Sequence, residues 1–184
     1  MMQGQERGYG PQGGQYGAHH QQQQGPGGPS PQARSQFQWV PATNGSIPPN
    51  AVQGGREKDG KPLYIARQWY KGGLHPGKAA PHLDGFYMCY DSKEVQLKEY
   101  FVLCGPAKAL QWIEVNGRVE PNGALWTPVT ECHEADGKPL YIAKTRYDGG
   151  EQLGKAGPHL DSYMCFPYGD KERDAKHYYV LAYV

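Results

Sequence analysis

Two pairs of oppositely charged residues stand at the same spacing in this chain. Lys78 follows Glu57 by 21 residues, and Lys155 follows Glu134 by 21 residues. A carboxylate accepts hydrogen bonds and an ammonium donates several, and such charge-assisted bonds are stronger than neutral ones. A Glu–Lys pair could therefore clamp adjacent hydroxyl groups of a sugar without a metal ion. The alternative is a plain surface ion pair, which usually contributes about 0–1 kcal/mol.

Other polar residues also occur twice, and structural roles explain them more simply. Asp59 and Asp136 each precede a glycine, which predicts a turn, with a ligand role in the same site as the alternative. The segments His82–Asp84 and His159–Asp161 match each other. They bring a histidine close to an aspartate, but no repeated nucleophile or further metal ligands accompany them. We expect a hydrogen-bonded loop there and no metal.

These residues belong to an internal duplication. The block DGKPLYIA occurs at Asp59–Ala66 and again 77 residues later at Asp136–Ala143. The same offset relates Pro81–Asp84 to Pro158–Asp161, and it changes by only a residue or so at later matches. Small changes of offset indicate loop insertions between matched segments. Any function should therefore be sought in both copies.

The elements that must hold these residues are short strands. Glycine and proline interrupt the chain every few residues, and β-branched and aromatic residues fill the runs between them. In Lys61–Arg67 the pattern places Leu63 and Ile65 on one face and Tyr64 and Ala66 on the other. A repeat of about 70 residues buries only a small core alone. We therefore predict an all-β fold in which two tandem repeats of short antiparallel strands form one pseudo-twofold, intertwined unit.

Composition divides the chain further. Residues 1–37 are rich in Gln, Gly and Pro and offer too little apolar surface to offset the entropy of ordering, which predicts a disordered tail. We assign repeat 1 to 38–107 and repeat 2 to 108–184. The net charge is +1, with no basic stripe, so nucleic acid is not the expected partner.

No apolar run of about 18 residues is present, and the chain lacks a charged start followed by an apolar core. We therefore expect no membrane span and a cytoplasmic location, with unconventional secretion as the alternative. The four cysteines, Cys89, Cys104, Cys132 and Cys165, form no C-x-x-C pair. We expect these cysteines to be buried free thiols rather than parts of a disulfide framework or a zinc ribbon.

Several spaced motifs resemble the DM-nine repeat family. They include the opening Trp39–Val52, Gly54–Arg56, Asp59–Arg67, Pro76–Lys78 and Tyr100–Leu103. The resemblance covers 38–104 fully and 111–182 more loosely. It implies an all-β fold of two intertwined repeats, and its best-understood members are mannose-binding lectins of invertebrate innate immunity. In those members an acidic residue before the turn works with the lysine of the Pro-Gly-Lys segment.

By this resemblance the sugar-binding residues are Glu57 with Lys78 and Glu134 with Lys155, supported by Asp59 and Asp136. The acidic residue is Glu where Asp is expected. In repeat 2, Gln53–Arg56 is replaced by Thr130–His133, so the second site is expected to be the weaker one. Trp69 has Arg146 as its counterpart, and it is either a ring that stacks on a sugar or a core or edge residue.

The resulting hypothesis is a non-enzymatic lectin that binds mannose-type glycans in recognition or defence, without metal or other cofactor, as a monomer or a homodimer. The alternative is a self-associating protein-interaction module whose low-complexity tail drives assembly. An enzyme is not expected. A glycosidase needs two carboxylates flanking the scissile bond, whereas each repeat offers a pair of opposite charge.

Overall fold

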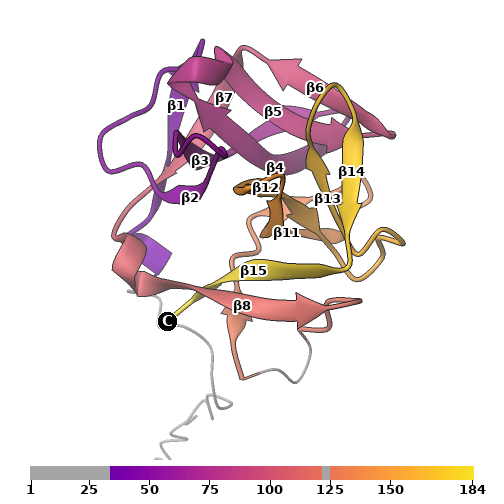
Figure 1. Ribbon diagram of the computed structural model, residues 1–184. Helices are drawn as coiled ribbons and strands as arrows, with labels where there is room; N and C mark the ends of the chain where they lie inside the picture. The colour runs from indigo at the N-terminus through magenta and orange to yellow at the C-terminus, as the bar shows by residue number, and fades with distance from the viewer. Residues whose placement is uncertain (1–33, 122–124) are drawn as a thin grey trace, which may run out of the picture.

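The computed structural model describes residues 34–121 and 125–184. Within these ranges the chain forms fifteen strands joined in one continuous antiparallel sheet system (Figure 1). The strands are β1 (Gln38–Thr43), β2 (Gln53–Arg56), β3 (Pro62–Tyr70), β4 (Gly73–Ala80), β5 (Gly85–Tyr90), β6 (Lys93–Leu97), β7 (Glu99–Cys104), β8 (Leu110–Asn116), β9 (Thr127–Pro128), β10 (Cys132–His133), β11 (Pro139–Tyr147), β12 (Gly150–Ala156), β13 (Met164–Pro167), β14 (Glu172–Ala175) and β15 (His177–Tyr183).

Helical conformation within these ranges is limited to Arg34 and Ser35 and to two 3₁₀ turns, η1 (Pro81–Leu83) and η2 (Ala107–Ala109). No helix among the described residues is both long and apolar enough to span a membrane. The prediction of an all-β fold of tandem repeats is thus confirmed. The tail predicted to be disordered lies outside the described residues up to position 33. Its last residue, Phe37, packs its ring against Tyr183, with the centroids 6.0 Å apart.

The two repeats exchange strand pairings. Strand β2 of repeat 1 pairs with β12 of repeat 2 through Arg56 and Glu151. Strand β10 of repeat 2 pairs with β4 of repeat 1 through His133 and Leu74. A shift of 77 residues converts one pairing into the other, so the exchange is reciprocal. In Figure 1, β4 and β12 lie side by side at the centre of the molecule, where the repeats meet.

The core follows the same symmetry. A central cluster takes residues from both repeats, with equivalent pairs such as Ile65 with Ile142 and Val52 with Val129. Two outer clusters each belong to one repeat, and Phe86 and Phe166 are their largest buried apolar rings. Because half of the central cluster comes from each repeat, separating the repeats would expose apolar surface on both.

The apolar residues of strand β3 suit its position between two core clusters. Leu63 and Ile65 are fully buried in the central cluster, and Ala66 is fully buried in the outer cluster of repeat 1 with Tyr64 packed against it. The predicted alternation is therefore confirmed, with the addition that both faces of the strand meet apolar neighbours. The neighbouring strand β4 is buried along its whole length, which places Lys78 in the interior.

Candidate functional site

The first site joins three side chains from both repeats. Lys78 on β4 is only 3% exposed, and its Nζ donates to Oε1 of Gln152 on β12 at 2.7 Å. Nε2 of Gln152 donates in turn to Oε2 of Glu57 at 2.9 Å. Glu57 follows β2 directly. The sequence-predicted pair is therefore brought together, but through a glutamine of the other repeat rather than by direct contact.

The second site holds the equivalent pair in direct contact. Nζ of Lys155 on β12 lies 3.8 Å from Oε1 of Glu134, which follows β10. The same Nζ lies 3.2 Å from Nδ1 of His75 on β4. Because a lysine ammonium only donates, His75 accepts through Nδ1 and is neutral in this arrangement. Nε2 of His75 lies 3.9 Å from Oε2 of Glu134.

His75 and Gln152 are the residues that sequence reasoning missed. They stand 77 residues apart at equivalent positions of the repeats, and each contacts the lysine of the other repeat. Both side chains are buried, with exposures of 1%. Their residue types differ, so a search for identical repeated residues passes over them. The constant offset of 77 residues between the repeats would have identified them as equivalent positions.

Histidines and aromatic rings complete both sites. Nε2 of His82 lies 3.6 Å from Glu57, and Nε2 of His159 lies 3.6 Å from Glu134. The lysine of each repeat also faces a tyrosine ring of the other repeat. Lys78 Nζ lies 5.5 Å from the Tyr168 ring centre, and Lys155 Nζ lies 5.6 Å from that of Tyr90. Such rings stabilise a desolvated cation.

Burial and charge set the protonation of these groups. Burial lowers the pKa of Lys78, and Glu57 and Glu94 oppose that shift. Burial together with the charge of Lys155 lowers the pKa of His75 to about 4. His75 is therefore neutral near pH 7, as its hydrogen bond requires. Burial also raises the pKa of Glu94 and of Glu172. The positive charge of the lysine of the same repeat opposes each of these shifts.

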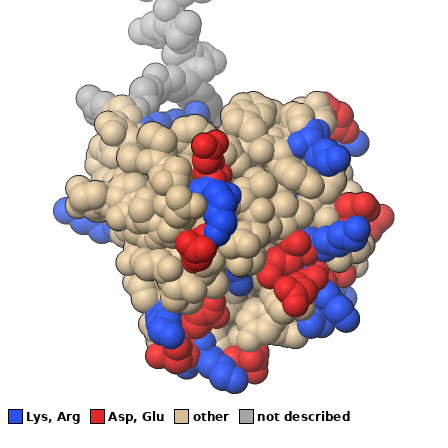
Figure 2. All heavy atoms as spheres, turned by 90° about the horizontal axis from the view of Figure 1, so that it is seen from above, with Lys and Arg blue, Asp and Glu red and all other residues tan. Residues whose placement is uncertain are grey.

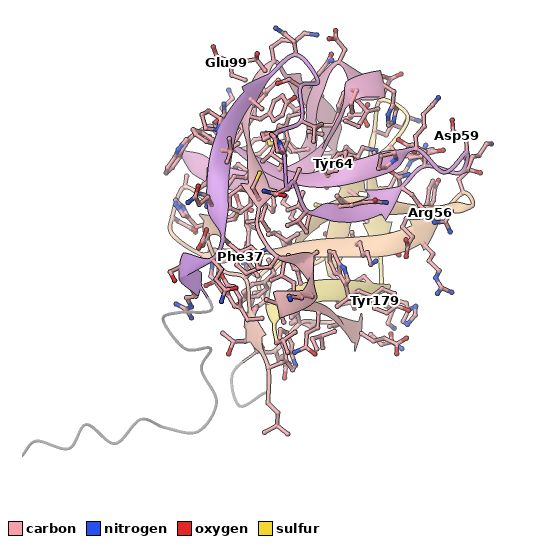
Figure 3. All side chains as sticks on the ribbon, turned by 90° about the vertical axis from the view of Figure 1, so that its left-hand side faces the viewer. Phe37, Arg56, Asp59, Tyr64, Glu99 and Tyr179 are labelled. Atoms are coloured by element: carbon pink, nitrogen blue, oxygen red, sulfur yellow. The ribbon has the colours of Figure 1, made fainter. Side chains whose placement is uncertain are left out.

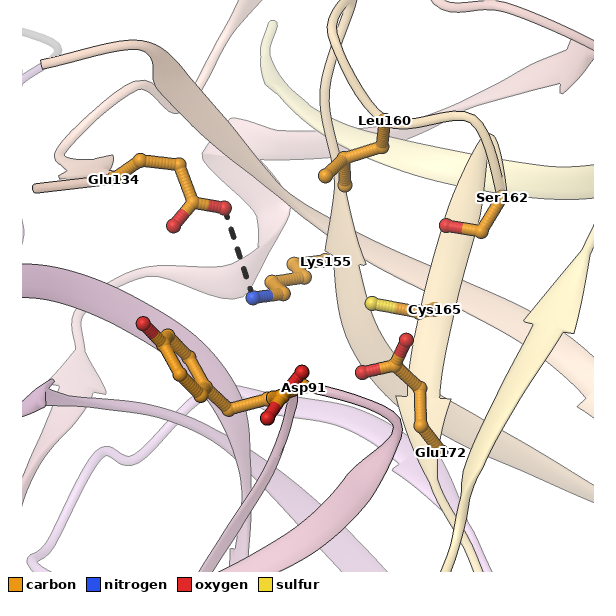
Figure 4. Close-up of a pocket in the computed structure, with 8 residues that line it drawn as sticks. Asp91, Glu134, Lys155, Leu160, Ser162, Cys165 and Glu172 are labelled. Carbon is orange, nitrogen blue, oxygen red and sulfur yellow. Dashed lines mark ion pairs between the residues drawn. The ribbon is translucent and has the colours of Figure 1, made fainter. Parts of the chain in front are cut away.

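A cavity of about 420 Å³ opens at the second site (Figure 4). In Figure 4 the Lys155 ammonium points toward Glu134, and Glu172 lies beside Cys165 across the cavity. The lining residues are Tyr90, Asp91, Glu134, Lys155, Leu160, Ser162, Cys165 and Glu172. Both donors and acceptors for hydrogen bonds therefore face one space.

A family comparison fits this geometry. The DM9 repeat matches residues 30–97 and again 69–175. The chain belongs to the DM9 repeat family. Both Glu–Lys pairs fall inside the matched residues, with Glu57 and Lys78 in the first match and Glu134 and Lys155 in the second.

One solved structure shows the DM9 fold of this chain in another protein, the nematode sperm cell motility protein MFP2B. The TM-score is 0.58 at 16% sequence identity. The alignment covers 79% of this chain and 46% of MFP2B, so the chain spans about half the length of that neighbour. At this identity the likeness concerns the fold alone. No curated protein is similar enough in sequence to count as a match.

The aspartates of the DM9 turns lie at the surface. Oδ1 of Asp59 accepts from the backbone N–H of Lys61 at 3.1 Å, and Asp136 makes the same contact with Lys138. Gly60, at φ +88°, supplies the left-handed residue of the first turn. Figure 3 shows Asp59 at the outer end of its turn. The structure therefore holds both aspartates in their turns, and a role for them in sugar binding stays a prediction.

Two further expectations concern the second DM9 repeat and Trp69. Cys132 is buried, and Nδ1 of His133 donates to the backbone carbonyl oxygen of Glu134 at 2.9 Å. The expectation that this replacement weakens the second site stays a prediction. Trp69 is 55% exposed, and its ring meets the edge of the His133 ring at 5.5 Å.

The surface offers no dominant sign of charge on the face seen in Figure 2. Acidic and basic side chains alternate there over a largely uncharged surface. All four cysteines are buried and free, as predicted. One group of potential metal ligands occurs among the described residues, Cys89 with Cys165 and Glu172. It lies outside both Glu–Lys pairs.

Proposed function

We propose that this DM9 protein binds mannose-type glycans at two composite sites, without a metal ion in the clamp and without turnover. The observation that carries the proposal is that each repeat sets a buried lysine near a glutamate that is only about one fifth exposed. An ammonium held away from bulk water keeps few solvent partners, so its hydrogen bonds to a ligand are worth more than at a surface.

The second site offers the room that such a ligand needs. Its cavity of about 420 Å³ lies within the range of about 300–1,000 Å³ that is usual for small-molecule sites. Tyr90 adds an apolar ring face against which the C–H face of a sugar can pack. Two adjacent hydroxyls could accept from Lys155 and donate to Glu134, a combination that suits the vicinal hydroxyls of a sugar.

Two sites in one chain would act together on clustered glycans. Binding of one site raises the effective concentration at the second, so affinity for a branched glycan should exceed that for the monosaccharide. Lys78 on β4 and Lys155 on β12 belong to one continuous sheet system, which supports a defined separation between the two proposed sites. We propose glycans rather than nucleic acids as partners, because acidic and basic residues balance.

A glycan array, repeated with a chelator, tests the proposal. We expect binding to mannose-rich glycans that the chelator leaves unchanged. Asp91 and Glu172 place further carboxylates in the cavity, so release of reducing sugar from bound glycans should be measured in parallel. Absence of glycan binding would refute the lectin function, and sugar release would refute binding without turnover.

A protein-interaction module is the second candidate. The exposed Trp69 borders a separate cavity of about 380 Å³, lined also by Gln68, Leu97, Lys98 and Glu99. Exposed tryptophans are enriched at the centres of protein interfaces. If the array is negative and Trp69→Ala abolishes self-association of the chain, this candidate replaces the lectin.

A further inference from the structure

The two equivalent cysteines of the repeats meet in the interior. Cys89 lies on β5 and Cys165 on β13, and these strands pack against each other. The two Sγ atoms are 2.7 Å apart. Cys89 is fully buried and Cys165 is 2% exposed. Residues that are 76 positions apart in sequence thus place two soft ligands together at the boundary between the repeats.

A carboxylate oxygen lies close to both sulfur atoms. Glu172 begins β14, and the neighbouring Cys89 thiol opposes the effect of burial on the pKa of its carboxyl group. The two Sγ atoms and a Glu172 oxygen all lie within 4.8 Å of one another. One thiol can donate to the other, and the carboxylate lies close to both sulfur atoms.

We propose that Cys89, Cys165 and Glu172 form a Zn²⁺ site with one open position. Thiolates select Zn²⁺ among the common divalent ions, at about 2.3 Å for sulfur and about 2.0–2.2 Å for carboxylate oxygen. Tetrahedral coordination at these lengths sets the sulfurs about 3.7 Å apart, so they must separate by about 1 Å. Cys165 and Glu172 line the 420 Å³ cavity, which gives the ion its entry path and a water its place as fourth ligand.

The charge balance favours this exchange. With both thiols protonated and Glu172 ionised, the three groups carry one negative charge in total. Binding of Zn²⁺ replaces the two thiol protons, which leave to solvent, and the total stays at one negative charge. The nearby Lys155, which interacts with both Cys89 and Glu172, therefore keeps the same electrostatic balance in both states. Because protons are released, binding should tighten as the pH rises.

Titration calorimetry of the reduced, chelator-treated full chain with Zn²⁺ tests the site. We expect one ion per chain and release of about two protons, read from the dependence of the heat on buffer ionisation. Cobalt in place of zinc should give the intense near-ultraviolet absorption of a thiolate-to-metal transition. Cys89→Ser, Cys165→Ser and Glu172→Gln should each weaken binding by about tenfold or more.

The repeat itself supplies matched controls. Glu94 is the counterpart of Glu172 in repeat 1, and Cys104 is another buried cysteine. Glu94→Gln and Cys104→Ser should leave Zn²⁺ affinity unchanged. Equal losses in these controls, or no zinc uptake by the unmodified chain, would overturn the proposal. So would a disulfide between Cys89 and Cys165, seen as a mass lower by two hydrogens, that persists after treatment of the chain with reductant.

The zinc site and the lectin function are separable. The Glu57–Lys78 site contains none of the three zinc ligands, so Cys89→Ser should retain glycan binding there. A Lys78 variant should likewise retain zinc. Native mass spectrometry and the cobalt spectrum of the unmodified chain decide the zinc proposal even where a cysteine variant does not fold.

Discussion

His75 and Gln152 stand at the same position of the two repeats, and each reaches the lysine of the other repeat. Nδ1 of His75 lies 3.2 Å from Lys155 Nζ, and Oε1 of Gln152 lies 2.7 Å from Lys78 Nζ. Each lysine therefore depends on a side chain that the other repeat supplies. Neither repeat contains a complete site by itself, although each contains its own Glu–Lys pair.

The first prediction concerns His75 and pH. The pKa of His75 is about 4 in the folded chain and about 6.5 in an unfolded one. Between these values the unfolded state binds the additional proton, so stability should fall as the pH drops from about 6.5 to about 4, by up to about 3 kcal/mol. His75→Gln copies the residue found in repeat 2 and should remove this part of the pH dependence.

Denaturant unfolding at several pH values measures this effect. The quantity to compare is the difference in unfolding free energy between the parent and His75→Gln, because all other residues are the same in both proteins. His177→Gln is the control, since His177 is exposed at the surface beside Glu114. Parallel pH profiles for the parent and His75→Gln would show that His75 does not carry the effect.

The second prediction concerns the sugar clamp. Lys78→Met keeps most of the buried volume but removes the donor, and hydrogen bonds to charged groups are worth about 1.5–3 kcal/mol. We expect mannose affinity at that site to fall by about tenfold to a hundredfold. Lys155→Met should do the same at the second site, and the double variant should show no binding heat.

Glu57→Gln and Glu134→Gln extend this test. Each keeps the shape of the side chain and removes its charge, so each should weaken one site. Calorimetry against mannose and a mannose-rich glycan provides the readout, and Lys108→Ala in the exposed η2 turn is the control. If the double lysine variant binds as tightly as the parent, the clamp lies elsewhere.

The third prediction is that 38–107 and 108–184 do not fold when expressed apart. Each would lose half of the central cluster and its reciprocal pairing, β2 with β12 or β10 with β4. Thermal unfolding of each half should lack a cooperative transition, and its amide NMR spectrum should be poorly dispersed. Mixing the two halves should restore both signals. Two halves that unfold cooperatively alone would contradict the intertwined core.

The fourth prediction concerns the glycine that precedes each lysine. A Cβ on Gly77 would lie 2.1 Å from the carbonyl oxygen of Tyr87 on β5, and one on Gly154 would lie 2.1 Å from that of Cys165 on β13. Backbone must move to accept a methyl group there, so Gly77→Ala and Gly154→Ala should each cost about 1–3 kcal/mol. Chemical denaturation tests this prediction. Unchanged denaturation midpoints would show that the backbone of these strands can move at little cost in stability.

The sequence alone determined the duplication, the all-β class and the two Glu–Lys pairs. These follow from local information, because identical blocks at a constant offset and alternating apolar residues are visible without coordinates. The turn roles of Asp59 and Asp136 are also local, since an aspartate before glycine bonds to its own backbone.

Only the tertiary structure decided which residues complete each site. The partners of Lys78 and Lys155 are Gln152 and His75, two different residue types from opposite repeats, and no local pattern marks them. The meeting of Cys89 with Cys165 is likewise a product of the pseudo-twofold packing of β5 against β13. Spacing along the chain reports neighbours within a strand or turn, whereas contacts across 70 or more residues depend on how the two repeats share one core.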